Sequence, residues 1–279
     1  SMPPSSYRQI HGREPLAPKV PEITALFWAV KILTTGMGEA TADYLADVNL
    51  LLAGATGLIG FVGALWVQFR VRRYHAPIYW FAVMMVAVFG TMAADGPPIG
   101  HIGSTIFYVL VLITVFYLWN RSEGTLSIHS IVTRRRETYY WATVLATFAL
   151  GTALGDLTAS TLHLGFLPSG IMFAAIIVVP AVAWWRFGLN EVAAFWLAYI
   201  VTRPLGASFA DWLGKPHARS GVGFGDGPVS GIATIMIIVL VGYVAVTRKG
   251  IQRSDVRPSA IPDPFRQPIP QPTRPVQLD

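Results

Sequence analysis

Residues 27–43 read FWAVKILTTGMGEATAD, and three later stretches repeat this pattern without a gap. The later copies are YWFAVMMVAVFGTMAAD at 79–95, YWATVLATFALGTALGD at 140–156 and FWLAYIVTRPLGASFAD at 195–211. Each copy opens with an aromatic residue and Trp, has Gly ten residues after the Trp, and ends with Asp fifteen residues after it. Self-similarity at fixed spacing indicates repeated structural units. We therefore expect four copies of one unit.

The composition places these units in a membrane. Of the 279 residues, 53% are hydrophobic and 13% are charged, whereas soluble domains carry about 25% charged residues. So few charges could not cover a surface that faces water, and the mean hydropathy is +0.50. The chain has no cysteine, which excludes disulfides, thiolate metal sites and a cysteine nucleophile.

Eight apolar stretches approach the length of about 20 residues that a helix needs to cross a bilayer. They lie at about 23–44, 49–69, 77–95, 103–120, 138–158, 167–186, 190–213 and 228–247. Because the alternating pattern of a porin-type barrel is absent, helices are the expected spanning structure. We predict an all-α integral membrane protein with eight transmembrane helices, arranged as four parallel tandem hairpins. Parallel repeats are related by an axis along the membrane normal, so the arrangement is expected to be pseudo-fourfold or pseudo-twofold.

The expected domain organisation has a membrane core between two tails. Residues 1–20 form an N-terminal tail, in which Ser1 before Met2 indicates a cloning remnant, and no removable signal peptide is expected. Residues 21–250 form the transmembrane domain, with repeats at about 21–75, 76–135, 136–188 and 189–250. Residues 251–279 are rich in proline and are expected to be a disordered tail.

The basic residues predict the orientation. With both termini on one side, that side receives 17 of the 21 Lys and Arg residues, and basic loops are cytoplasmic. We therefore predict a multi-pass protein of the bacterial inner membrane with cytoplasmic N- and C-termini. The net charge of +6 is explained by this topology, so nucleic-acid binding is not expected. The 17 residues are Arg8, Arg13, Lys19, Arg70, Arg72, Arg73, Arg121, Arg134, Arg135, Arg136, Arg186, Arg248, Lys249, Arg253, Arg257, Arg266 and Arg274.

The phrases TTGMGEATAD, FGTMAADG, LGTALGD and TRPLGASFAD give the chain a family resemblance. It resembles bacterial membrane proteins built from four tandem copies of a two-helix repeat of unknown function, each with a characteristic tryptophan. The resemblance covers about residues 20–248. It implies the repeat architecture and no activity, so the function must be inferred from the residues themselves.

The repeated acids carry the strongest functional signal. Carboxylates inside a bilayer cost about 2.5 kcal/mol or more at its centre, and these also fall toward the negative C-terminal ends of helices. Such a set requires cations, protons or hydrogen-bond donors, and rings of acids select cations in pores. One helical turn earlier, Thr91 and Thr152 occupy the position of Glu39. The predicted ion pathway comprises Glu39, Asp43, Asp95, Asp156, Asp211, Thr91 and Thr152.

Other polar residues are candidates for gating and for outer metal ligands. Lys31 and Arg203 are basic residues within the predicted spans, and an ion pair between Arg203 and Glu39 is expected to be structural or to act as a gate. Pro204 removes a backbone hydrogen bond, so its surroundings are expected to be irregular or mobile, whereas Pro180 is expected at most to kink its helix. The possible outer metal ligands are His101, His163, His217 and Asp47.

The predicted function is cation transport, with a divalent metal such as Mn²⁺ as the substrate of an exporter or exchanger. Oxygen-rich sites suit such hard cations. Two alternatives remain open: a membrane scaffold that transports nothing, in which the acids accept hydrogen bonds between repeats, and a pathway for protons or small solutes. Because no phosphate-binding loop, HExxH or serine-elbow motif occurs, no enzyme activity and no cofactor are expected. The expected partners are the lipid bilayer and a metal cation or proton, and the oligomeric state is unknown.

Overall fold

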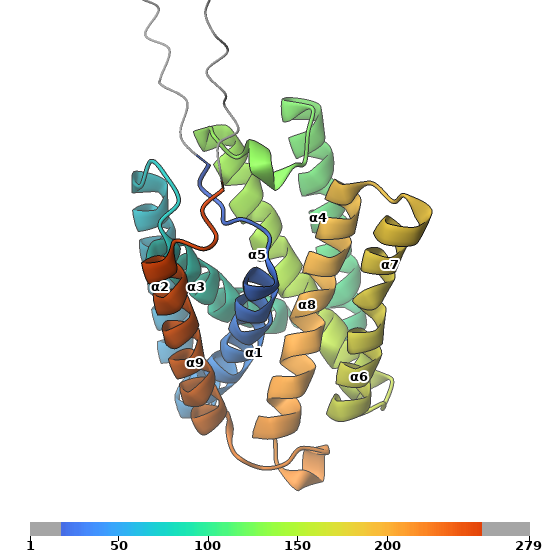
Figure 1. Cartoon of the computed structure of the whole chain (residues 1–279). Coiled ribbons are helices and arrows are strands. Elements are labelled where there is room, and N and C mark those ends of the chain that lie inside the picture. Colours follow the sequence, from blue (N-terminus) through green and yellow to red (C-terminus); the bar gives the residue numbers. More distant parts are fainter. Residues whose placement is uncertain (1–17, 253–279) are drawn as a thin grey trace, which may run out of the picture.

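The computed structural model describes residues 18–252, and every regular element in this range is helical (Figure 1). The predicted all-α fold class is therefore confirmed, and the helices follow the predicted spans within a few residues. Of the tails predicted at 1–20 and 251–279, residues 1–17 and 253–279 lie outside the described residues, while Lys19, Val20 and Gln252 are buried against the bundle. The α-helices are α1 (Ala25–Val48), α2 (Leu50–Arg70), α3 (Ala76–Asp95), α4 (Gly100–Glu123), α5 (Arg134–Asp156), α6 (Phe166–Ile176), α7 (Val178–Phe187), α8 (Glu191–Gly214) and α9 (Asp226–Thr247).

Seven helical segments in the described part of the chain are long and apolar enough to cross a membrane. They are α2, α3, α4, α8, α9, the pair α6 and α7 taken together, and α5 extended by a π-helical turn at Leu157–Thr161. The eighth predicted span is α1, which has 24 residues but is not among the seven. It carries four charged residues, Lys31, Glu39, Asp43 and Asp47, and these lower its hydropathy.

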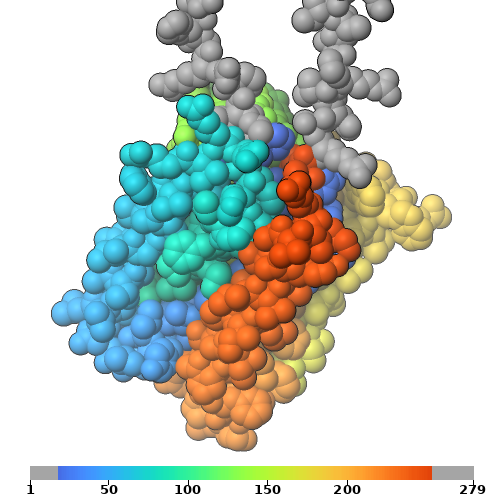
Figure 2. Space-filling model, turned by 60° about the vertical axis from the view of Figure 1, so that its left-hand side comes forward, coloured from blue at the N-terminus to red at the C-terminus, as the bar shows by residue number. Residues whose placement is uncertain are grey.

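The repeated pattern lies on four inner helices. α1, α3, α5 and α8 each carry one copy, and they contact one another in the cyclic order α1–α3–α5–α8–α1. The helix after each inner helix packs on the next inner helix, so that α2 contacts α3, α4 contacts α5, α6 contacts α8 and α9 contacts α1. Figure 2 shows α2 and α9 lying outermost on one face of the molecule. The outer helices leave most of their large apolar side chains exposed, as helices in contact with lipid do.

The repeat glycine allows the inner helices to approach closely. On each inner helix it faces the residue that stands seven positions after Trp on the next inner helix. At Gly90, for example, an added Cβ would lie 2.7 Å from the Cβ of Phe148, which is closer than two carbon atoms can approach. The same packing is made in all four copies, by Gly38 on Ala87, Gly90 on Phe148, Gly151 on Arg203 and Gly206 on Thr35.

The two membrane-buried prolines differ from expectation. Pro204 lies inside α8, which is helical without interruption from Glu191 to Gly214, so the predicted irregularity there is wrong. The break lies instead near Pro180, where α6 ends at Ile176 and α7 begins at Val178. α8 is an inner helix that contacts α1, α5, α6, α7 and α9, whereas α7 contacts mainly α8. Pro180 has no amide hydrogen to donate one turn back, and fewer neighbours hold its helix straight.

The two described chain ends are fastened at the same end of the helix bundle (Figure 1). The amide of Glu22 donates to the carbonyl of Gly250 at 2.8 Å, and the amide of Tyr74 donates to the carbonyl of Pro18 at 3.0 Å. Lys19 forms an ion pair of 2.5 Å with Glu137, and both side chains are 1% exposed. The inner helices run from this end, where their tryptophans lie, to the opposite end, where their aspartates lie.

Candidate functional site

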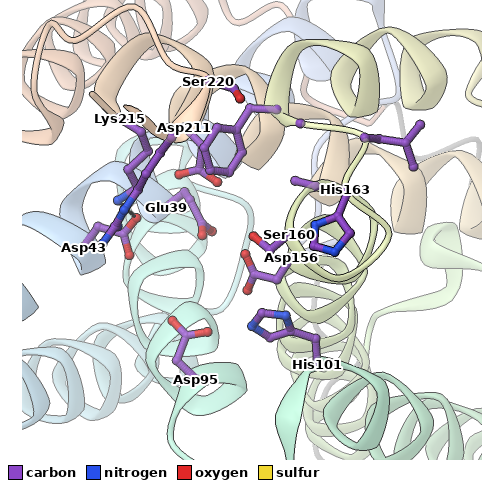
Figure 3. A pocket seen from close by; sticks show the side chains of 15 residues that line it. Glu39, Asp43, Asp95, His101, Asp156, Ser160, His163, Asp211, Lys215 and Ser220 are labelled. Atoms are coloured by element: carbon purple, nitrogen blue, oxygen red, sulfur yellow. Dashed lines mark hydrogen bonds and ion pairs between the residues drawn. The ribbon is translucent and has the colours of Figure 1, made fainter. Parts of the chain in front are cut away.

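A cavity of about 610 Å³ opens at the end of the bundle opposite the chain ends. It is lined by Glu39 and by all four repeated aspartates, Asp43, Asp95, Asp156 and Asp211 (Figure 3). We call this space the acidic cavity. The sequence predicted that these five carboxylates would meet, and they do so because each aspartate ends the pattern of one inner helix. Four helix C-termini therefore direct their partial negative charge toward the same space.

Three of the carboxylates lie close enough to share one ion. Glu39, Asp156 and Asp211 each offer an oxygen, and these three oxygens lie within 4.8 Å of one another. Oxygen ligands stand about 2.0–2.6 Å from Mg²⁺ or Ca²⁺, so two oxygens on opposite sides of one ion are about 4–5 Å apart. Asp211 is 6% exposed, and its Oδ1 is buried without a hydrogen-bond partner in the described residues.

The floor of the acidic cavity is an ion pair that was expected from the repeat positions. Arg203 Nη2 donates to Glu39 Oε2 at 2.6 Å, and the two side chains are 0% and 4% exposed. The same nitrogen, which carries two hydrogens, also lies within hydrogen-bonding distance of the hydroxyls of Thr152, at 2.7 Å, and Thr91. Nη1 donates to the carbonyl of Thr35. One guanidinium thus contacts the three other inner helices.

Thr91 and Thr152 belong to this floor and not to the cavity wall. Their hydroxyls each lie 3.3 Å from Glu39 Oε2 and can donate to it, and both residues are buried. In the fourth copy the equivalent residue is Ala207, which has no polar side-chain atom. The polar residues predicted one helical turn before the aspartates therefore form a hydrogen-bonded layer centred on the carboxylate of Glu39.

Lys31 lies below the floor and makes no ion pair with any described residue. Its Nζ is buried without a hydrogen-bond partner and lies 3.9 Å from the ring centre of Phe148 and 4.1 Å from that of Tyr199. The rings stabilise an ammonium through cation–π contacts. The pair of Arg203 and Glu39 expected from the sequence is present. Lys31, a candidate for gating or an ion pair, forms no ion pair with the described residues, and a role in gating stays a prediction.

The bundle is packed shut between the floor and the chain ends. Tyr79 and Tyr140 meet there with their hydroxyl oxygens 2.5 Å apart, and both are fully buried or nearly so. The tryptophans of the second, third and fourth copies, Trp80, Trp141 and Trp196, are 2–4% exposed and lie in the same core. The acidic cavity is accordingly accessible from one end of the molecule.

Lys215 closes one side of the acidic cavity. Its Nζ lies 2.5 Å from Asp43 Oδ2 and 2.9 Å from Asp226 Oδ2. Burial opposes its charge, but Asp43, Asp211 and Asp226 outweigh this effect and raise the pKa of Lys215 above its ordinary value. Neither Lys215 nor Asp226 was among the predicted site residues. The available signal was that Lys215 is one of only two basic residues on the acidic side and follows Asp211 by one turn.

The candidate outer ligands separate into two groups. His101 and His163 line the acidic cavity, and His101 Nδ1 lies 3.0 Å from the hydroxyl of Thr161. His217 and Asp47 are exposed and do not line it. His217 packs beside Gly223 in the loop before α9, and Asp47 lies one turn beyond Asp43. A similar distance in sequence from the repeated aspartate therefore did not place the three histidines alike, because His101 lies in the first turn of α4, His163 between α5 and α6, and His217 between α8 and α9.

The chain matches a known family of repeats. A family model described as Repeat of Unknown Function (DUF347) matches residues 26–74, 139–189 and 194–249, which is more than half of the chain. These ranges contain the first, third and fourth copies of the pattern. No curated protein and no solved structure matches the chain. The resemblance drawn from the sequence is confirmed, and the chain belongs to this tandem-repeat family of unknown function.

Proposed function

We propose that this protein transports cations, and that its substrate is a divalent metal ion of the Mn²⁺ type, moved as an exporter or exchanger. One observation carries the proposal: five carboxylates from all four inner helices line one cavity, and three of their oxygens lie within 4.8 Å. The arrangement resembles the oxygen-rich environment that hard divalent cations prefer.

The charge balance of the acidic cavity supports a dication. Glu39 is paired with Arg203 and Asp43 with Lys215. Asp95, Asp156 and Asp211 have no ion pair with any described residue. Carboxylates that share a site repel one another unless a proton or a cation intervenes. A bound divalent ion would supply that compensation, and the imidazoles of His101 and His163 at the wall suit a transition metal.

The proposed topology has eight spans, with α1 as the eighth. α1 has 24 residues, and it belongs to the cyclic contacts of the inner helices, where its charged side chains Lys31 and Glu39 are buried away from lipid. The cyclic packing of the four repeat glycines favours a pseudo-fourfold axis along the membrane normal. Basic residues gather at the end that holds the chain ends. We therefore assign that end to the cytoplasm of a bacterial inner membrane and the acidic cavity to the opposite side.

A non-transporting scaffold is the second candidate, and one observation favours it. Glu39 has an internal ion pair and two threonine donors, as a purely structural carboxylate would. Under this reading the acids only join repeats, and their amide variants would lower stability without altering any flux.

The test is metal binding and flux of the purified protein. Mn²⁺ should raise the melting temperature in detergent, because a ligand that binds only the folded state stabilises it, and reconstituted liposomes should take up Mn²⁺. Asp156→Asn and Asp211→Asn should remove both effects, whereas Asp47→Asn, an exposed acid outside the cavity, should retain them. Absence of both effects for Mn²⁺, Mg²⁺, Ca²⁺ and Zn²⁺ would favour the scaffold. Proton flux without metal dependence would favour the proton pathway.

A further inference from the structure

Arg203 stands out because it breaks the fourfold pattern at the axis of the bundle. The equivalent residues in the other copies are Thr35, Ala87 and Phe148, and none of these carries a charge. Its side chain packs over Gly151, where an added Cβ would overlap its Cβ and Cγ. From there the guanidinium reaches α1, α3 and α5. A single side chain therefore closes the space between all four inner helices.

Glu39 connects this closure to the acidic cavity. Its Oε2 accepts the hydrogen bond from Arg203 at 2.6 Å, while the residue also lines the cavity and offers an oxygen to the cluster with Asp156 and Asp211. The buried Oδ1 of Asp211, which has no partner among the described residues, points to a missing ligand in the same cluster. The carboxylate of Glu39 therefore faces two cation positions. One is occupied by the guanidinium of Arg203, and the other is the proposed metal position beside Asp156 and Asp211.

We propose that Arg203 is the positioning residue that couples ion binding to the opening of the axis. A divalent cation bound by Glu39, Asp156 and Asp211 neutralises part of the negative charge of Glu39. The ion pair between Glu39 and Arg203 is thereby weakened, and the guanidinium leaves the floor. This inference rests on the proposed transport function. In this proposal the guanidinium of Arg203 competes with the metal ion for the carboxylate of Glu39. While the acidic cavity contains no metal, Arg203 stays bound to Glu39 and keeps the axis closed.

The physical basis is reciprocal coupling. If metal binding weakens the pair of Arg203 and Glu39, then removing Arg203 must strengthen metal binding by the same factor. Couplings between sites of this kind are typically about 5- to 150-fold in affinity. A residue with a structural role alone would show the opposite effect, because a disordered floor would displace Glu39 and weaken the site.

The test measures Mn²⁺ affinity by titration of purified protein. Arg203→Gln should bind Mn²⁺ about 5- to 150-fold more tightly than the unchanged protein, and Arg203→Lys, which keeps the charge, should restore most of the original affinity. Lys31→Met removes the neighbouring buried amine, which does not contact Glu39, and serves as the matched control with a much smaller change. Equal or weaker binding by Arg203→Gln would overturn the inference, while Mn²⁺ binding by the unchanged protein would leave the proposed function standing.

A second measurement covers the case in which Arg203→Gln fails to fold. The chain has no natural cysteine, so Val144→Cys introduces a single thiol at the repeat position of Lys31, where Val144 is 0% exposed. Mn²⁺ should increase the rate at which a small thiol reagent labels this residue, and Glu39→Gln should abolish the increase. A labelling rate that does not depend on Mn²⁺, in protein that is stabilised by Mn²⁺, would refute the coupling and leave metal binding intact.

Discussion

The ion pair between Arg203 and Glu39 should dominate the stability of the metal-free protein. The two charged atoms are 2.6 Å apart and their side chains are 0% and 4% exposed, so loss of either partner leaves a buried charge without compensation. Removing one partner of such a pair costs about 3–5 kcal/mol. Glu39→Gln and Arg203→Gln should each lose about this amount. The double variant should lose much less than their sum, because no unpaired charge remains.

Thermal unfolding in detergent without added metal provides the assay, with all four proteins in one buffer. The Asp47→Asn variant is the control, since this exposed side chain should change stability by less than about 0.5 kcal/mol. Losses that simply add in the double variant would refute the reasoning. They would mean that the two residues stabilise the fold independently and that the floor of the acidic cavity is not a charge pair.

Three further predictions follow from the packing, the ion pairs and the topology. Gly206→Ala should destabilise the protein by about 1–3 kcal/mol through overpacking. Gly54→Ala should not, because an added Cβ there meets nothing within 4 Å. Equal melting temperatures of the two variants would contradict the close approach of the inner helices. The pKa of Lys215 is raised in the folded protein, so the stabilisation by its ion pairs should be complete below pH 10.5 and lost as the pH rises through the folded pKa. In melting experiments at different pH, a Lys215→Met variant should lack this loss of stability at alkaline pH. In intact cells an impermeant thiol reagent should label His217→Cys and not His129→Cys, and the reverse result would invert the proposed orientation.

The four hairpins and the helices that carry the repeated pattern could be predicted from the sequence. The fixed spacing of Trp, Gly and Asp places these residues at the same heights on four helices, because an α-helix rises by a constant 1.5 Å per residue. Parallel hairpins of equal length then bring the four aspartates to one end of the bundle. The convergence of Glu39 and the aspartates on one cavity, and the pairing of Glu39 with Arg203, follow from this regularity.

The sequence-based predictions differed from the structure where the conformation or contacts of a residue depend on its neighbours in space. Pro204 was expected to disturb its helix, but α8 is surrounded by other helices and remains regular, while the less constrained segment near Pro180 breaks. Lys31 was a candidate for gating or an ion pair, but its ammonium contacts aromatic rings that come from α5 and α8. No spacing within α1 could indicate those rings.

Periodicity and composition alone determined the repeated helical hairpins, the helices that carry the pattern and the common level of their acids, because these depend on the geometry of single helices. Tertiary structure decided which acids are compensated. Lys215 reaches Asp43 and Asp226 from the end of α8, which the sequence did not predict. Since Glu39 is paired with Arg203, Asp95, Asp156 and Asp211 are the repeat acids that have no ion pair among the described residues. Ion pairs form between side chains that packing brings within a few ångströms, and a linear sequence does not specify that proximity.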